Sequence, residues 1–280
     1  MKTTTLNQYK KQLEPLLKPV EKVDLVDLIP GIQTNPQQEC AIIIQEGDEK
    51  KIVNVCSKQY HLLPNKHFIE PLLEVFGDAN IQIVTDARLD ARFSIDIIFE
   101  DLKADIMGKD PVKAKLKVHN SYDGRAKYQF HMGFFRMICK NGMIIPLEGF
   151  ENKNISSKMR HMPILGDTFD KDSIRSMVDN FGMNMLDYQL PFTKLAELRV
   201  SENALPDLLK EVTTKTKFPV RQLDDVIDRL QIEMNELDED LNHWLIYNAF
   251  NYQLNHSEAI VMDPSKKEQL DHDIFALLLK

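Results

Sequence analysis

Apolar and polar positions alternate with a strand-like period through the first half of the chain and with a helical period after residue 168. β-branched runs at residues 41–44 and 52–55 flank a polar turn at residues 46–49, which predicts a hairpin. Pro64 opens a segment in which apolar residues recur at helical spacing as far as Gly77, which predicts a helix. Further extended runs separated by turn residues predict an antiparallel meander over residues 81–85, 93–99, 112–118 and 126–135.

Three helices are predicted after residue 168. Asp172 or Ser173 can cap the first, the second covers residues 193–213 with a break at Pro206, and the third begins after Pro219. The third helix carries an apolar seam at alternating spacings of three and four, made of Val220, Leu223, Ile227, Leu230, Met234, Leu237 and Leu241. The seam fits a homo-oligomer formed through residues 220–241. A helix packed on its own domain is the preferred interpretation, because only about three heptads are present.

These elements predict an α+β protein with an antiparallel β-sheet core, a helix packed on that sheet, and a mainly helical C-terminal third. Residues 1–165 are expected to form a mixed α+β domain that contains the meander. Residues 166–280 are expected to form a mainly helical, acidic region packed on the sheet domain.

Charge is distributed unevenly along the chain. The net charge of −8 by itself argues against nucleic-acid binding, because clustered Lys and Arg drive the binding of phosphates. Residues 109–160, however, contain 11 basic and 4 acidic side chains, whereas residues 201–280 contain 8 basic and 16 acidic ones. The basic middle therefore keeps nucleic-acid binding open.

A strand in this basic middle places its charged side chains on one face, at Lys113, Lys115, Lys117 and His119. The following strand continues that face with Lys127. We expect a flat positive surface at which lysines neutralise phosphates. At the connecting turn, an exposed Tyr122 can stack on an unpaired base, and Arg125 can hold a phosphate by two hydrogen bonds.

The same face has an alternative, purely structural role. If the strands pair around Gly108, Glu100 falls near Lys113 and Asp96 falls near Lys117, which would make ordinary cross-strand ion pairs. Nucleic-acid binding is slightly preferred because the lysines outnumber the acids available to them.

Arg136 lies in an apolar stretch, residues 134–143, that contains an Asn-Gly turn. A cation in such a stretch needs a carboxylate or a phosphate as its partner, and carboxylates are the commoner solution. The predicted nucleic-acid contacts are Lys113, Lys115, Lys117, His119, Tyr122, Arg125, Lys127, Arg136 and Lys140.

The sequence lacks the usual catalytic signatures. It contains no Gly-rich phosphate loop, no His-Glu-x-x-His zinc helix, no Cys-x-x-Cys pair and no Gly-x-Ser-x-Gly elbow. The eight histidines show no ligand spacing. We therefore expect no catalytic residues, no metal site and no cofactor, and enzymatic activity is not the preferred interpretation.

The expected location is the cytoplasm. Cys40, Cys56 and Cys139 are few, odd in number and widely spaced, which fits free thiols in a reducing compartment. The N-terminus lacks the apolar core of a signal peptide, and no stretch of about 18 apolar residues could span a bilayer. No membrane partner is expected.

Five sequence elements carry a resemblance to a known family, at residues 60–65, 88–93, 120–124, 135–143 and 244–252. In their order and spacing the chain resembles the phage and plasmid-like proteins built around domain of unknown function 932. It departs from that pattern at Lys140, where Ser is expected before Asn-Gly, and at Phe250, where Val or Leu is usual. The resemblance implies residence on a phage, plasmid or integrated element and, by association, a role in DNA transactions.

The predicted function is therefore a non-enzymatic DNA-binding protein of a phage or mobile element that binds or anneals single-stranded DNA through the basic sheet face. The alternative is an interaction or anti-defence protein whose acidic helices bind a host protein.

Overall fold

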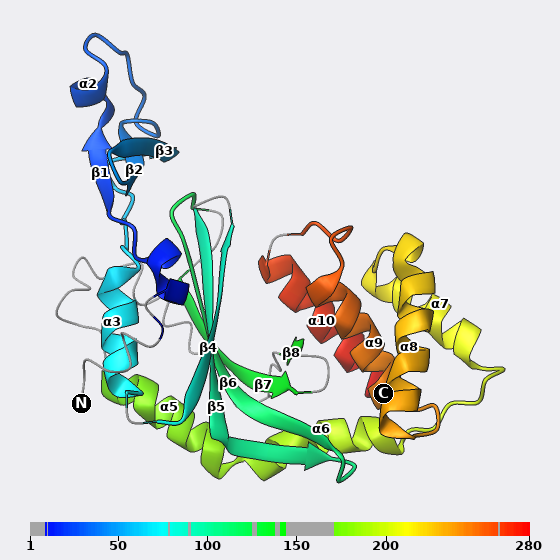
Figure 1. Ribbon diagram of the computed structural model, residues 1–280. Coiled ribbons are helices and arrows are strands. Elements are labelled where there is room, and N and C mark those ends of the chain that lie inside the picture. The colour runs from blue at the N-terminus through cyan, green and yellow to red at the C-terminus, as the bar shows by residue number, and fades with distance from the viewer. Residues whose placement is uncertain are drawn as a thin grey trace. The chain divides into compact units, whose positions relative to one another are not determined.

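The computed structural model of the chain describes residues 9, 11–77, 79–88, 91–124, 128–137, 141–143, 171–262 and 264–280. The N-terminal half contains two antiparallel sheets and the C-terminal third is helical, so the predicted α+β class is confirmed (Figure 1).

A small three-stranded sheet comes first, with strand order β1, β2, β3. Its strands are β1 (Val20–Asp24), β2 (Cys40–Glu46) and β3 (Glu49–Cys56), and both pairings are antiparallel. The predicted hairpin is confirmed as β2 and β3, whereas β1 was not predicted. Residues 40–44 of the central strand are all buried, as their unbroken apolar run requires. The short helix α2 (Leu25–Leu28) adds Leu25 to the core on one face of this sheet.

The predicted meander forms a five-stranded sheet with its strands in chain order. These strands are β4 (Ile81–Arg88), β5 (Arg92–Ile106), β6 (Asp110–Ser121), β7 (Gln129–Arg136) and β8 (Asn141–Met143). The chain turns from β5 into β6 through Met107 and Gly108, both with positive φ, a conformation that glycine adopts at no steric cost. Because β6 lies between β5 and β7 in the sheet, it is an interior strand with a neighbour on each side.

The helix predicted after Pro64 is confirmed as α3 (Lys66–Val75). It buries Phe68, Leu72 and Leu73, and the Phe68 ring contacts the Tyr128 ring with centroids 4.9 Å apart. A 3₁₀ turn, η1 (Glu14–Leu16), precedes β1 and buries Leu16.

The second half of the chain is built from helices α5 (Lys171–Met183), α6 (Met185–Glu197), α7 (Leu205–Thr216), α8 (Leu223–Leu237), α9 (His243–His256) and α10 (Pro264–Leu278), with the 3₁₀ turn η2 (Val220–Gln222) before α8. The second predicted helix, residues 193–213 with a break at Pro206, consists of parts of two helices. That segment is divided between α6 and α7, because Pro206 lies in the first turn of α7, where its missing N–H costs no hydrogen bond.

Helix α9 is the most buried helix of this half, and both α8 and α10 pack against it (Figure 1). Its N-terminus is capped by the Asn242 side chain, which accepts a hydrogen bond from the Leu245 N–H at 3.0 Å. Leu230 and Leu237 of the predicted apolar seam are buried, and so is Leu241, whereas Val220 is exposed. The seam thus serves the interior of its own domain, and an oligomer formed through residues 220–241 stays a prediction.

Contacts divide the chain into two compact units. Unit 1 comprises Met1–Ile97, Leu116–His131 and Glu151–Val178, and unit 2 comprises Ile98–Lys115, Met132–Phe150 and Asp179–Lys280. The division falls within β5, β6, β7 and α5. The boundary predicted between residues 165 and 166 lies outside the described residues. No helix in the described part of the chain combines the length and apolarity needed to cross a bilayer.

A buried hydrogen-bond network in unit 1 joins the end of β6 to the start of α3. The Tyr122 hydroxyl accepts from the Asn65 N–H at 3.0 Å, and the Asn120 side chain donates to Asn65 Oδ1 at 2.8 Å. Asn65 Nδ2 in turn donates to the Leu16 carbonyl at 2.9 Å. Tyr122 also packs edge-on against Phe93.

We predict that Tyr122→Phe lowers the free energy of unfolding by about 1 to 2 kcal/mol, because it keeps the ring contact but leaves the buried Asn65 N–H without its acceptor. Urea denaturation would measure the loss. Tyr252→Phe, which retains the ring stacked on Arg229, is the matched control and should change stability little. Equal losses in the two variants would contradict a structural role for the Tyr122 hydroxyl.

Candidate functional site

The expected positive face of β6 is not exposed. Lys113 is 8% exposed, Lys115 1% and His119 5%, although alternation predicted them at the surface. The reason is that β6 is an interior strand and both of its faces are covered, so that Val112, Ala114 and Leu116 are buried as well. The prediction that Lys113, Lys115 and His119 form a flat positive surface is therefore wrong.

The remaining predicted contacts lie in different surroundings. Tyr122 was expected as an exposed stacking platform, but it is 2% exposed, and burial raises the pKa of its hydroxyl well above the usual value. Lys117 is half-buried. Three of the predicted contacts, Arg125, Lys127 and Lys140, lie outside the described residues.

The buried lysines of β6 are matched by carboxylates of unit 2. Lys113 forms a short ion pair with Glu100 of β5, which confirms this part of the cross-strand alternative. The charge of Lys115 acts on Asp271 of α10, where it favours the ionised carboxylate. These two lysines are therefore used inside the fold.

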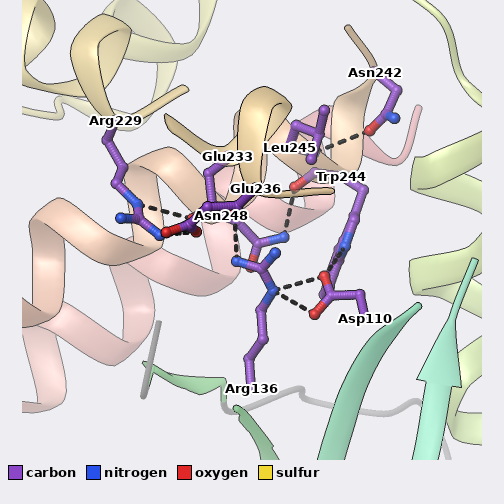
Figure 2. A network of polar contacts seen from close by, with 9 residues as sticks. All are labelled: Asp110, Arg136, Arg229, Glu233, Glu236, Asn242, Trp244, Leu245 and Asn248. Carbon is purple, nitrogen blue, oxygen red and sulfur yellow. Dashed lines mark hydrogen bonds and ion pairs between the residues drawn. The ribbon is translucent and has the colours of Figure 1, made fainter. Parts of the chain in front are cut away.

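Arg136 on β7 is completely buried and is held by two carboxylates (Figure 2). Its Nε donates to both oxygens of Asp110, at 2.9 and 2.7 Å, and its Nη1 donates to Glu233 Oε2 at 2.6 Å. Of the two partners considered for Arg136, carboxylate and phosphate, the structure has the carboxylate. A buried guanidinium is tolerated only with such partners, because an unpaired charge in a low-dielectric interior is very costly.

The network continues into helices α8 and α9. Arg229 donates to Glu233 Oε1 at 2.6 Å, and the Trp244 indole N–H donates to Asp110 Oδ2 at 2.8 Å. The Trp244 ring also lies 5.7 Å from the Arg136 guanidinium carbon. Burial raises the pKa of Asp110, while the charge of Arg136 and the bonds from Trp244 and Arg136 oppose that rise. Two arginines thus face two buried carboxylates, and the cluster is close to neutral.

A second buried polar cluster lies on the same helix. Tyr247 donates to Asp271 Oδ2 at 3.0 Å, and Asn251 donates to Asp271 Oδ1 at 2.7 Å. Burial raises the pKa of Asp271 to about 6, with Glu268 adding to the rise and Asn251, Tyr247 and Lys115 opposing it. The polar positions of α9 follow one face at helical spacing, at Trp244, Tyr247, Asn248 and Asn251.

Both clusters hold the interior of unit 2 together. Their carboxylates are occupied by arginine, indole, phenol and amide donors of the same unit. Among the described residues, no group of three or more His, Cys, Asp or Glu side chains is arranged to hold a metal ion. The sequence reasoning missed Asp110, Glu233 and Asp271. The sequence contained one signal for these acids, the recurrence of Trp, Tyr and Asn at helical spacing along residues 244–251. Polar groups on one face of an otherwise apolar helix indicate buried hydrogen-bond partners.

A family model described as "Domain of unknown function (DUF932)" matches residues 53–274. The match contains the strands of the larger sheet, the polar face of α9 and most of α10. No curated protein and no solved structure matches the chain.

We predict that Arg136→Met lowers the free energy of unfolding by about 3 to 5 kcal/mol, because it leaves the buried carboxylates of Asp110 and Glu233 uncompensated. Chemical denaturation followed by circular dichroism would measure the loss. Arg199→Met removes an ion pair with Glu239 in which Arg199 is 54% exposed, and it should have little effect. A loss in Arg136→Met no larger than in this control would show that the buried pairs are not needed for folding.

We predict a pH-dependent stability that originates at Asp271. Its pKa of about 6 in the folded chain lies above the ordinary value of 3.8, so the folded state binds the proton more tightly than the unfolded state. The free energy of unfolding therefore falls by about 3 kcal/mol as pH rises from about 4 to about 6, because the Asp271 carboxyl loses its proton in the folded state over this range.

Asp271→Asn should remove this decline, because its side chain does not ionise. Unfolding free energies measured between pH 4 and pH 8 would show it. Asp273→Asn, an exposed position on the same helix, is the control and should keep the wild-type profile. An unchanged profile in Asp271→Asn would exclude this carboxyl as the source.

Proposed function

The chain belongs to the family of domain of unknown function 932, whose description states no activity, and we propose that this member binds single-stranded DNA without catalysing a reaction. Such a protein would bind or anneal single strands during replication or recombination. In this proposal the phosphate contacts come from the other cations predicted in the basic middle, namely Lys117, Arg125, Lys127 and Lys140. Lys113, Lys115 and Arg136 act in folding instead.

The charge balance of the basic middle supports this proposal. Residues 109–160 contain only 4 acidic side chains against 11 basic ones. The structure describes two of these acids, and both are bound by arginines, Asp110 by Arg136 and Asp123 by Arg92 at 2.7 Å. Asp110 and Asp123 are thus engaged by arginines, and the segment's net charge of 11 − 4 = +7 is the feature that would attract phosphates.

We predict that single-stranded oligonucleotides bind the wild-type chain in a salt-dependent manner, and that the triple variant Arg125→Glu, Lys127→Glu, Lys140→Glu binds at least about tenfold more weakly at low salt. Fluorescence anisotropy across a salt series, with single-stranded and duplex oligonucleotides of the same sequence, would measure both effects. Tighter binding of the single strands than of the duplex is the result that the proposal requires.

The matched control is Lys103→Glu, Lys194→Glu, Lys210→Glu. It changes the net charge by the same amount at three exposed lysines of unit 2. The control should retain affinity close to that of the wild type. Equal losses in both triple variants would mean that net charge alone drives binding, and no binding at low salt would refute the proposal.

A protein partner is the second candidate, favoured by the exposed acidic face of α8. Asp224, Asp225 and Asp228 are exposed, while Val226 and Leu230 of the same helix are buried. Such a face complements a basic protein surface, as expected of an interaction or anti-defence protein. The variant Asp224→Asn, Asp225→Asn, Asp228→Asn would then lose the partner while DNA affinity stayed unchanged.

We also propose that the chain acts in the cytoplasm of a bacterial host, encoded by a phage, plasmid or integrated element. The free thiols of Cys40 and Cys56 fit a reducing compartment.

A further inference from the structure

Two cysteines face each other directly across the hairpin of β2 and β3. Cys40 begins β2 and Cys56 ends β3, and the two residues are register partners in the antiparallel ladder. Both are free thiols, with relative exposures of 1% and 7%. Directly opposed residues of a sheet project from the same face, so the two thiols are neighbours.

The register of the two cysteines is compatible with a disulfide. Directly opposed residues in antiparallel pairs have Cα atoms about 4.5 to 5.5 Å apart. Disulfides join residues whose Cα atoms lie about 4.4 to 6.8 Å apart. The usual Cα spacing of opposed residues therefore lies within the range that a disulfide spans.

We propose that Cys40 and Cys56 are a redox site that closes to an intramolecular disulfide when the cell becomes oxidising. The oxidant is a low-molecular-weight disulfide such as oxidised glutathione. One thiol loses its proton and attacks this oxidant, forming a mixed disulfide and releasing one thiol. The second cysteine then displaces the other half as a second thiol, so that two electrons and two protons pass from the protein to the oxidant.

The surroundings of the pair set its reactivity. Cys40 Sγ donates to Asp24 Oδ1 at 3.2 Å, and Lys58 binds the other Asp24 oxygen at 3.1 Å. Burial raises the pKa of both thiols, and the hydrogen bond and negative charge of Asp24 raise that of Cys40 further. The reaction is consequently slow at neutral pH and accelerates as pH rises, since the thiolate is the attacking species.

Exposure and position indicate which thiol reacts first. Cys56 has the greater exposure and ends an edge strand, so its thiolate attacks the oxidant first, and Cys40 then resolves the mixed disulfide. Oxidation removes the hydrogen bond from Cys40 to Asp24 but leaves the ion pair between Asp24 and Lys58. The new bond closes the loop that contains residues 41–55 and so stabilises the hairpin against unfolding.

The test uses the intact wild-type chain, incubated with oxidised glutathione and then alkylated and digested without reduction. Peptide mass spectrometry should show the peptides of Cys40 and Cys56 joined with a loss of about 2 Da, and the unmodified thiols should return after reduction. The melting temperature of the oxidised chain should exceed that of the reduced chain by several degrees. The rate of closure should increase between pH 7 and pH 9.

Cys40→Ser and Cys56→Ser are the controls, and neither should gain stability on oxidation. Cys56→Ser should also leave Cys40 largely unmodified, whereas Cys40→Ser should accumulate glutathione on Cys56. Persistence of both wild-type thiols, or linkage of either to Cys139 or to a second chain, would overturn the proposal. Because the linkage is read directly on the wild-type protein, a folding defect in a variant cannot hide the result.

Discussion

The burial of one guanidinium governs the interior of unit 2. Arg136 has no exposed surface, so its charge has to be balanced by carboxylates of the chain. Asp110 lies 26 residues before it and Glu233 lies 97 residues after it, so the three side chains tie β6, β7 and α8 together. Such an arrangement favours the native state mainly because other compact conformations, in which the partners are separated, would leave a buried charge without its counter-charge.

The same requirement explains the composition of α9. A helix with neighbours on several sides would be expected to be apolar throughout, yet Trp244, Tyr247 and Asn251 carry polar groups into the core. Each of these groups donates to a buried carboxylate, Trp244 to Asp110 and the other two to Asp271. The polar face of α9 is therefore the complement of the buried acids, and the family match includes both.

These pairings change which cations are available for a ligand. Lys113, Lys115 and Arg136 belong to a basic segment, but each is buried near a carboxylate of the same unit. A segment rich in basic residues thus does not necessarily form a basic surface, because some of its cations are buried. The DNA-binding proposal accordingly assigns no DNA contact to Lys113, Lys115 or Arg136, and the Cys40 and Cys56 site is independent of it.

The sequence by itself determined the α+β class, the hairpin of β2 and β3, the meander and α3, because strand and helix periodicity and turn residues are local properties. It also determined that Arg136 needs a partner. Only the tertiary structure decided that the partners are Asp110 and Glu233, since those contacts span 26 and 97 residues. It likewise decided that Lys113 and Lys115 are buried. Alternation shows which side chains share a face of β6, but what covers that face depends on segments far away in the chain.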